Sequence, residues 1–235
     1  MSAAVLQGFR DARGAIGTAL AVTALMASWL CVAVAGLLER PAFYAATSGP
    51  REPSLLEAAT FGIVLPLASY ALCARLGTTR DELMSEHWAR HGSSRRRYAL
   101  GRIAFTTALG AALTISSAVL AFALSRVVLM PAPAGGIGAG LGAIVAVAAL
   151  GAVSYAAGFS LAQLVGGIWG RILFLALDWT LGSSAGVAAL PWPRAHLRSL
   201  LGGPAVLGMS AAQAAQFLVC LALVSVLIYA RRVPP

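Results

Sequence analysis

Two oppositely charged side chains, Arg171 and Asp178, lie inside one long apolar stretch of the sequence. Both fall within residues 164–188, and their spacing of seven puts them on one helical face, two turns apart. If this stretch spans a membrane, both charges are costly to bury there. Two interpretations stay open. The side chains pair or line an intramembrane polar path for an ion or proton, or each simply marks one end of a helix.

Catalytic patterns are weak in the remainder of the sequence. Asp178 has no evident partner carboxylate of the kind an intramembrane aspartyl protease needs. The chain has no lysine, so it cannot contain a GxxxxGK[ST] phosphate loop. His87 and His91 are spaced i, i+4, but no cysteine or third histidine lies near them, which favours a solvated face over a metal site. We expect no catalytic residue, metal or cofactor in this chain.

The composition indicates an integral membrane protein. Of the 235 residues, 59% are hydrophobic and 11% are charged, whereas a soluble domain is about 25% charged. All 17 basic residues are arginine, and asparagine is absent, which is typical of a GC-rich genome, and we expect a bacterial source. The three cysteines lie in separate apolar runs, so we expect small apolar side chains rather than disulfides.

Hydropathy predicts an all-α protein with one transmembrane domain, residues 1–235, containing six membrane-spanning helices. Each predicted span has about the length that a bilayer requires. The spans are about 15–38, 54–74, 103–125, 137–160, 164–188 and 206–230. Pro66 lies inside the second span, where we expect a kink and a neighbouring group that satisfies the freed carbonyl.

The arginines predict the topology. With the N-terminus inside, 12 of the 17 arginines fall on the inner side and five on the outer side. Both termini are therefore expected in the cytoplasm, and the protein in a bacterial cytoplasmic (inner) membrane. This distribution also explains the basic charge without a nucleic-acid partner.

Small and polar residues suggest how the spans pack. Gly138 and Gly142 form one GxxxG pair, and Gly166 and Gly170 form another, so helix backbones can approach closely within the chain or between subunits. Polar side chains inside the spans can hydrogen-bond between helices. They include Gln213 and Gln216 in the last span and Thr114 in the third.

The cytoplasmic loop, residues 75–102, has the pattern of a built helix rather than a tether. Thr79 and Glu82 fit a capping box, and Gly92 is a left-handed stop, so a helix is predicted over 80–91. Its apolar face comprises Leu83, Met84 and Trp88. Such a face must lie on the membrane surface, on the protein's own body or on another protein.

Two further segments have amphipathic or basic patterns. Arg95, Arg96 and Arg97 precede the third span and serve either as an anchor on anionic lipid or in a specific contact. Residues 183–205 are broken by prolines and glycines, and PRAHLRSLL within them predicts a short amphipathic helix. This outer segment suits a re-entrant or interfacial element.

Together these features resemble the permease subunit of type-2 ATP-binding-cassette transporters, which are mostly exporters. The resemblance rests on the six spans, on the loop sequence RDELMSEHWARHGSSRRRYALGRI, and on the broken outer segment before the last span. It implies that residues 80–91 are a coupling helix that docks on a separate ATPase. The docking residues would be Asp81, Glu82, Leu83, Met84, Glu86 and Trp88.

The resemblance also implies that ATP and Mg²⁺ bind in the partner ATPase, and that the permease pairs with a second or related copy. The N-terminal segment before the first span is shorter than is usual in that family, with Leu6 and Phe9 as its apolar contacts. The alternative is a polytopic protein of another class: an ion-coupled transporter, a channel or a scaffold that uses Arg171 and Asp178.

Overall fold

The computed structural model describes residues 3–13, 60–74, 79–92, 94–129, 136–201 and 203–232. These residues form helices and short turns, and no strand occurs among them. The predicted first span (15–38) and the first residues of the second lie outside this part of the chain. Among the described residues, three helical stretches are long and apolar enough to cross a membrane, and a shorter apolar helix covers Thr60–Cys73. The three are Arg95–Ser116, Val145–Ser183 and Ala211–Arg231.

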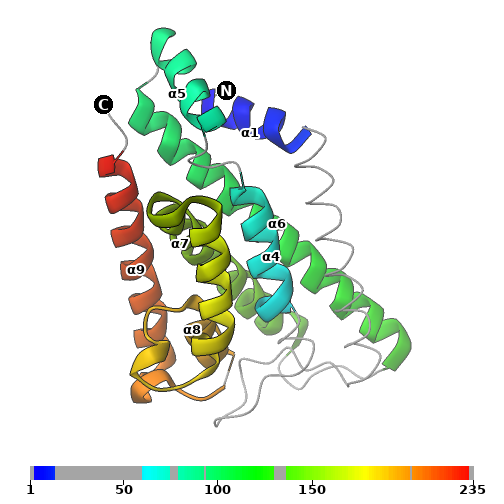
Figure 1. Ribbon diagram of the computed structural model, residues 1–235. Coiled ribbons are helices and arrows are strands. Elements are labelled where there is room, and N and C mark those ends of the chain that lie inside the picture. Colours follow the sequence, from blue (N-terminus) through cyan, green and yellow to red (C-terminus); the bar gives the residue numbers. More distant parts are fainter. Residues whose placement is uncertain are drawn as a thin grey trace.

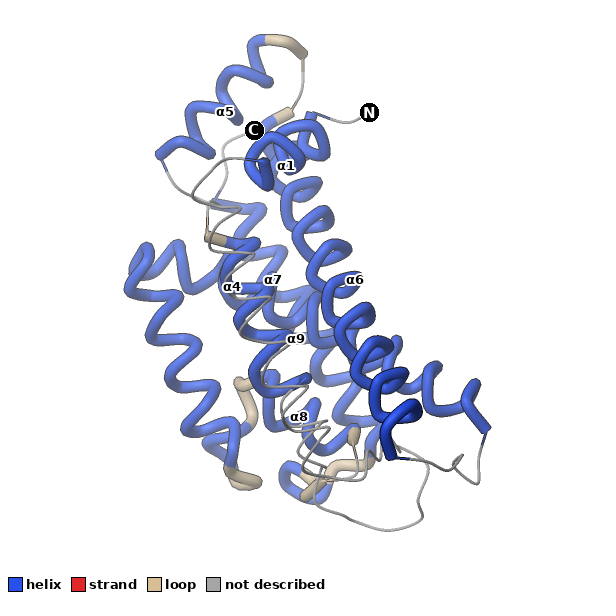
Figure 2. Tube along the Cα trace, turned by 90° about the vertical axis from the view of Figure 1, so that its right-hand side faces the viewer, coloured by secondary structure: helices blue, strands red, loops and turns tan. Residues whose placement is uncertain are grey.

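The helices form an elongated bundle with distinct ends (Figure 1). Helices α1, α5 and the last turn of α9 lie at one end, and α8 lies at the other, as Figure 2 also shows. The longer elements are α1 (Ala3–Arg13), α4 (Leu65–Cys73), α5 (Thr79–Arg90), α6 (Arg95–Leu129), α7 (Gly136–Thr180), α8 (Pro193–Leu200) and α9 (Ala211–Arg232). The short turns are η1 (Thr60–Val64), η2 (Leu181–Ser183), η3 (Val187–Ala189) and η4 (Val206–Gly208).

The core lies where α4, α6, α7 and α9 meet, and α8 closes it at one end. Leu65, Phe159, Leu197 and Leu218 are buried in one cluster that these elements share. Gly151 brings α7 against α4 and α8, because a Cβ there would overlap the side chain of Leu65. The core therefore fixes the positions of both charged side chains on α7.

The predicted irregularity at Pro66 is present as a π-helical turn, η1, directly before α4. Proline has no N–H to donate to the carbonyl four residues earlier, which belongs to Gly62. The indole Nε1 of Trp179 and the guanidinium of Arg194 donate to this carbonyl, each at 3.0 Å. Neighbouring segments thus satisfy the freed carbonyl, as the sequence predicted.

Helix α7 folds back on itself at Gly166 and Gly167. Both have non-helical backbone angles, and Gly167 has a φ of 59° that favours glycine. Contacts between the two halves follow an antiparallel register. Tyr155 donates to Asp178, Phe159 packs edge-on against Phe174, and Gly170 lies against the backbone of Ala162.

This turn refines the predictions for spans four and five. Gly166 forms the reversal itself and does not pack one helix against another. Gly170 lies close to the backbone of Ala162 in the first half of α7. The predicted fifth span, 164–188, is longer than the helix after the turn, because residues 181–189 form the short turns η2 and η3. Gly142 of the other predicted pair has no atom within 4 Å of a Cβ built on it.

The last helix, α9, begins at Ala211, five residues after the predicted start. The backbone N–H of Ser210 donates to Oε1 of Gln213 at 2.8 Å, and the N–H of Gln213 donates to Oγ of Ser210 at 3.3 Å. This reciprocal pair is a capping box. Gln213 therefore caps its own helix and does not bond between helices, and Thr114 likewise bonds the Gly110 carbonyl of its own helix.

Candidate partner-docking site and buried polar contacts

Helix α5 lies at the end of the bundle that carries α1 and the C-terminal turn of α9 (Figure 1). It covers Thr79–Arg90, close to the predicted 80–91, with Asp81 and Glu82 in its first turn. The N–H groups of His91 and Gly92 close the last turn, and Gly92 has a φ of 84°. The predicted left-handed stop is confirmed.

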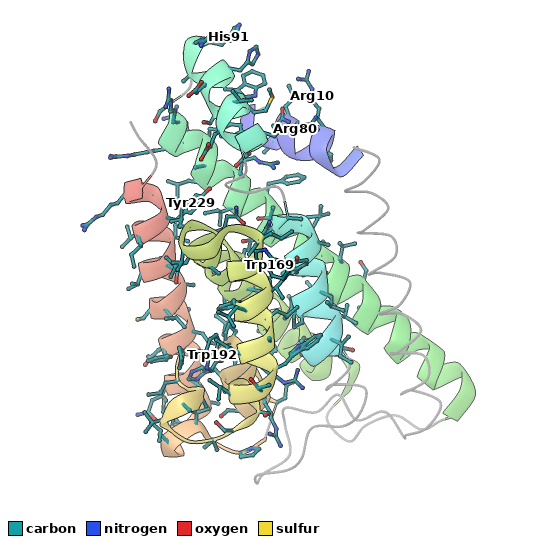
Figure 3. The ribbon with its side chains drawn as sticks, viewed as in Figure 1. Arg10, Arg80, His91, Trp169, Trp192 and Tyr229 are labelled. Carbon is teal, nitrogen blue, oxygen red and sulfur yellow. The ribbon has the colours of Figure 1, made fainter. Side chains whose placement is uncertain are left out.

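A buried polar cluster attaches α5 to α6. The Asp81 carboxylate lies 3.4 Å from Nε of Arg102 and accepts a hydrogen bond from the Tyr98 hydroxyl at 3.2 Å. All three side chains are buried. Tyr229, near the end of α9 (Figure 3), is also buried and close enough to interact electrostatically with this pair.

Sequence reasoning missed this cluster. It placed Arg102 at the end of the cytoplasmic loop 75–102 and Asp81 among the residues that dock on an ATPase, whereas Asp81 is buried against α6. Tyr98 and Arg102 are spaced i, i+4, which places both on one face of α6 towards the loop. This spacing was the feature of the sequence that could have indicated the buried cluster. A buried pair of this kind holds the base of α5 in one position, because separating it would leave a charge unpaired.

The remainder of α5 presents a mixed surface. Leu83 is 57% exposed, and Glu82 is also exposed. Met84, Glu86 and Trp88 are half-buried. His87 and His91 are exposed at the same end of the bundle as Arg10 and Arg80 (Figure 3), and Nδ1 of His91 pairs with the His87 carbonyl at 2.8 Å. The apolar face is thus divided, with Leu83 outward and Trp88 partly covered.

The arginine triplet begins α6 instead of preceding it. Arg95 lies 3.8 Å from the Glu86 carboxylate, a half-exposed pair that contributes at most about 1 kcal/mol. Arg96 and Arg97 are exposed. Their role as a lipid anchor stays a prediction.

Helix α1 packs across the first part of α6, a contact that the sequence did not indicate. A Cβ at Gly101 would overlap the side chain of Ala4, and Phe9 packs edge-on against Phe105 with ring centroids 5.2 Å apart. The short N-terminal segment therefore forms a helix beside α6, at the same end of the bundle as α5 (Figure 2).

Arg171 caps the end of a neighbouring helix. Its guanidinium donates to the carbonyls of Cys73 and Ala74 at the end of α4, the second at 2.9 Å, and lies over the Tyr70 ring. The last carbonyls of a helix lack intrahelical donors, and a cation there also suits the helix dipole. Buried Arg171 thus satisfies groups that would otherwise have no partner.

Asp178 satisfies the start of another helix. Its Oδ1 accepts the backbone N–H of Arg194 at 3.0 Å, and its Oδ2 accepts the Tyr155 hydroxyl at 2.7 Å. Arg194 is in the first turn of α8, whose N-cap residue, Trp192, makes no side-chain cap. Arg171 and Asp178 thus have separate partners at opposite ends of the same half of α7.

The amphipathic helix predicted within residues 183–205 is present as α8. Leu197 and Leu201 are buried, while Arg198 donates to the Ser183 carbonyl at 3.0 Å. His196 is also buried, although it is polar. Its Nε2 donates to the Leu190 carbonyl at 2.8 Å, and its ring stacks on Phe217.

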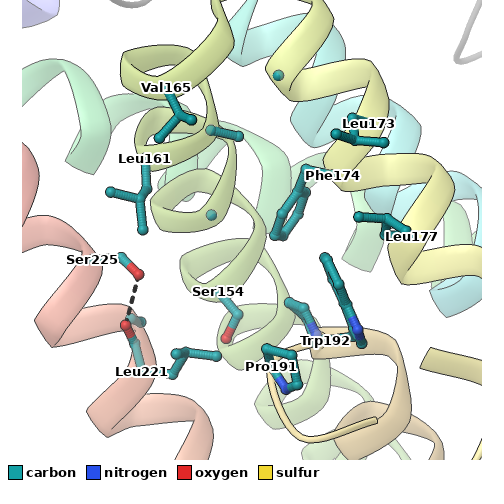
Figure 4. A pocket seen from close by; sticks show the side chains of 15 residues that line it. Ser154, Leu161, Val165, Leu173, Phe174, Leu177, Pro191, Trp192, Leu221 and Ser225 are labelled. Atoms are coloured by element: carbon teal, nitrogen blue, oxygen red, sulfur yellow. Dashed lines mark hydrogen bonds between the residues drawn. The ribbon is translucent and has the colours of Figure 1, made fainter. Parts of the chain in front are cut away.

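A groove of about 340 Å³ lies between the two halves of α7 and helix α9 (Figure 4). Residues Pro191–Pro193 close one end of this groove, called the α7–α9 groove below. Among the described residues that line it, Ser154 and Ser225 carry the side-chain hydroxyls, and each donates to a carbonyl of its own helix at 2.8 Å. Its main apolar lining comprises Leu161, Val165, Leu173, Phe174, Leu177 and Leu221.

Comparison with known proteins gives no relative. A scan against protein-family models finds no matching family, and searches of curated proteins and of solved structures find no match.

Proposed function

We propose that the chain is the membrane-spanning permease subunit of an ATP-binding-cassette exporter. It would cross a bacterial cytoplasmic membrane six times, with both termini inside and α8 in a re-entrant outer segment. Two permease copies, identical or related, would alternate access to the substrate while a separate ATPase hydrolyses ATP.

The observation that carries this proposal is the construction of α5. One side of its first turn is buried through Asp81, Arg102 and Tyr98, whereas Leu83 projects outward from the same turn. A helix that is fixed at its base and exposes an apolar residue suits transmission of a partner's movement into α6. A loop that served only as a tether would need no buried ion pair at its base.

The proposal predicts that a cassette ATPase is encoded beside this chain, and assembly with that ATPase is the test. Both proteins are co-expressed, and the permease is purified in detergent. We expect the ATPase to co-purify with the unchanged chain and Leu83→Glu to reduce its recovery at least tenfold. A charge in the centre of an interface is costly to desolvate, whereas at an exposed position of the free chain it is not.

Val187→Glu is the matched control, because Val187 is 70% exposed and lies in η3, towards the α8 end of the bundle. It introduces the same charge away from α5 and should leave ATPase recovery unchanged. Equal recovery with Leu83→Glu and with the unchanged chain would contradict the docking role of α5. Substrate movement in proteoliposomes without nucleotide would instead favour an ion-coupled transporter or channel.

A further inference from the structure

The α7–α9 groove has the properties of a site for a single hydrocarbon chain. It lies within Val145–Ser183 and Ala211–Arg231, two of the stretches apolar enough to cross a membrane. The two hydroxyls in its lining are engaged by their own helices. Among the described lining residues, the indole Nε1 of Trp192 is buried without a hydrogen-bond partner at the Pro191–Pro193 end, and the rest of the surface offers apolar contact, which favours a hydrocarbon ligand.

The dimensions of the groove limit its occupant. Its lining on the first half of α7 runs from Ser154 to Val165, a rise of about 16 Å along the helix. The hydrocarbon core of a bilayer is about 30 Å thick, so each leaflet contributes about half of that. The groove is thus as long as one acyl chain of one leaflet, and it is too short for a second transmembrane helix.

The groove is accessible from the lipid side of the bundle. Val165 is 85% exposed and Leu173 is 58% exposed, and these two residues line opposite walls near the turn of α7 (Figure 4). Pro191 and Trp192 close the other end of the groove. Along Leu161, Leu173 and Phe174 the groove is apolar and will not hold ordered water, because water needs polar partners there.

We infer that the α7–α9 groove binds one acyl chain of a membrane phospholipid. The chain lies along the first half of α7, between Leu161 on one side and Leu173 and Phe174 on the other. It fills the space that these helices leave and supports the hairpin of α7 against α9. This inference is independent of the proposed transport function.

Photolabelling of the full-length chain tests the inference. The protein is reconstituted into vesicles of phosphatidylethanolamine and phosphatidylglycerol that contain a phospholipid with a diazirine in mid-chain. After irradiation, labelled positions are mapped by mass spectrometry. We expect labelling at Leu161, Val165 and Leu173 to exceed that at Leu223 and Leu227 at least fivefold. The latter two are exposed on α9 and do not line the groove.

Two variants fill the groove from different walls, so that the test does not depend on one of them folding. Ser225→Phe fills it from α9, and Ala162→Leu fills it from α7. Each should lower groove labelling at least fivefold. Val224→Phe is the control, because Val224 is exposed, adjacent to Ser225 and outside the groove. It should leave the labelling unchanged.

Three results would overturn the inference. One is equal labelling of the groove and of the outer face of α9, which would indicate ordinary lipid contact. Another is groove labelling that persists in both filled variants. The third concerns a benzophenone amino acid introduced at position 173. Predominant crosslinking of this group to a second protein chain, rather than to phospholipid, would show that a protein interface covers the groove.

Discussion

The carboxylate of Asp178 accepts the backbone N–H of Arg194 at 3.0 Å, across 16 residues of sequence. The cap of α8 is therefore supplied by α7 and not by the residue that precedes α8. Trp179 and the guanidinium of Arg194 reinforce the same junction by donating to the Gly62 carbonyl. One polar junction thus joins α7, α8 and the π-helical turn before α4.

Asp178→Ala should destabilise this junction strongly. It leaves the N–H of Arg194 and the hydroxyl of Tyr155 without their acceptor, at a cost of about 1–3 kcal/mol each. We expect the free energy of unfolding, measured by SDS titration of the purified protein in mixed micelles, to fall by about 2–6 kcal/mol. Tyr155→Phe removes only the second contact and should cost less. If Asp178→Ala is as stable as the unchanged protein but transport is lost, a polar-path role for Asp178 replaces the structural one.

The attachment of α5 through Asp81 and Arg102 gives a second prediction. Arg102→Met leaves the buried Asp81 carboxylate without its cation, which typically costs about 3–5 kcal/mol. We expect the amides of Thr79–Arg90 to exchange with deuterium at least tenfold faster, while those of α9 remain protected. The double variant Asp81→Ala, Arg102→Met removes both charges and should restore part of the protection. Unchanged exchange of α5 in Arg102→Met would contradict the attachment.

These junctions mark the limit of what the sequence could predict. Helices α5 and α8 were predictable because their determinants are local: Asp81 and Glu82 at one start, Gly92 at one end, and the leucine and arginine spacing of PRAHLRSLL. Arg171 and Asp178 stood out because charge inside an apolar run is costly. Their partners did not, since the carbonyls of Cys73 and Ala74 and the N–H of Arg194 are backbone groups that every residue possesses.

The reversal within α7 was predicted between spans 137–160 and 164–188, slightly before its actual position at Gly166 and Gly167, for a related reason. The spacing of Gly166 and Gly170 suits two helices in close contact, and it also suits a tight turn followed by a close approach to the preceding helix. Sequence spacing cannot separate these cases, because both need the absence of a side chain. The backbone angles of Gly166 and Gly167 decide between them.

The three glycines of this turn form a matched set of variants. Gly170→Ala places a Cβ against the carbonyl oxygen of Ala162, and Gly167→Ala forces alanine to a φ of 59°. We expect Gly170→Ala to lower the free energy of unfolding by about 1–3 kcal/mol through overlap. Gly167→Ala should lower it by about 1–2 kcal/mol through backbone strain. Gly166→Ala meets no atom within 4 Å and should stay within about 0.5 kcal/mol of the unchanged protein. Thermal unfolding in detergent measures all three, and equal effects at the three positions would contradict the turn.

The buried imidazole of His196 predicts a pH dependence. Burial lowers the pKa of His196 below its ordinary value of 6.5, although the hydrogen bond to Leu190 opposes this in part. Below about pH 6.5, His196 therefore binds a proton in the unfolded chain but not in the folded one. The contribution of neutral His196 to stability is present above that pH and is lost as the pH falls. We expect the unfolding temperature to drop between pH 7 and pH 5. His196→Gln can still donate to the Leu190 carbonyl but does not titrate, so it should show a smaller drop. The same drop in both proteins would assign the pH dependence to other groups.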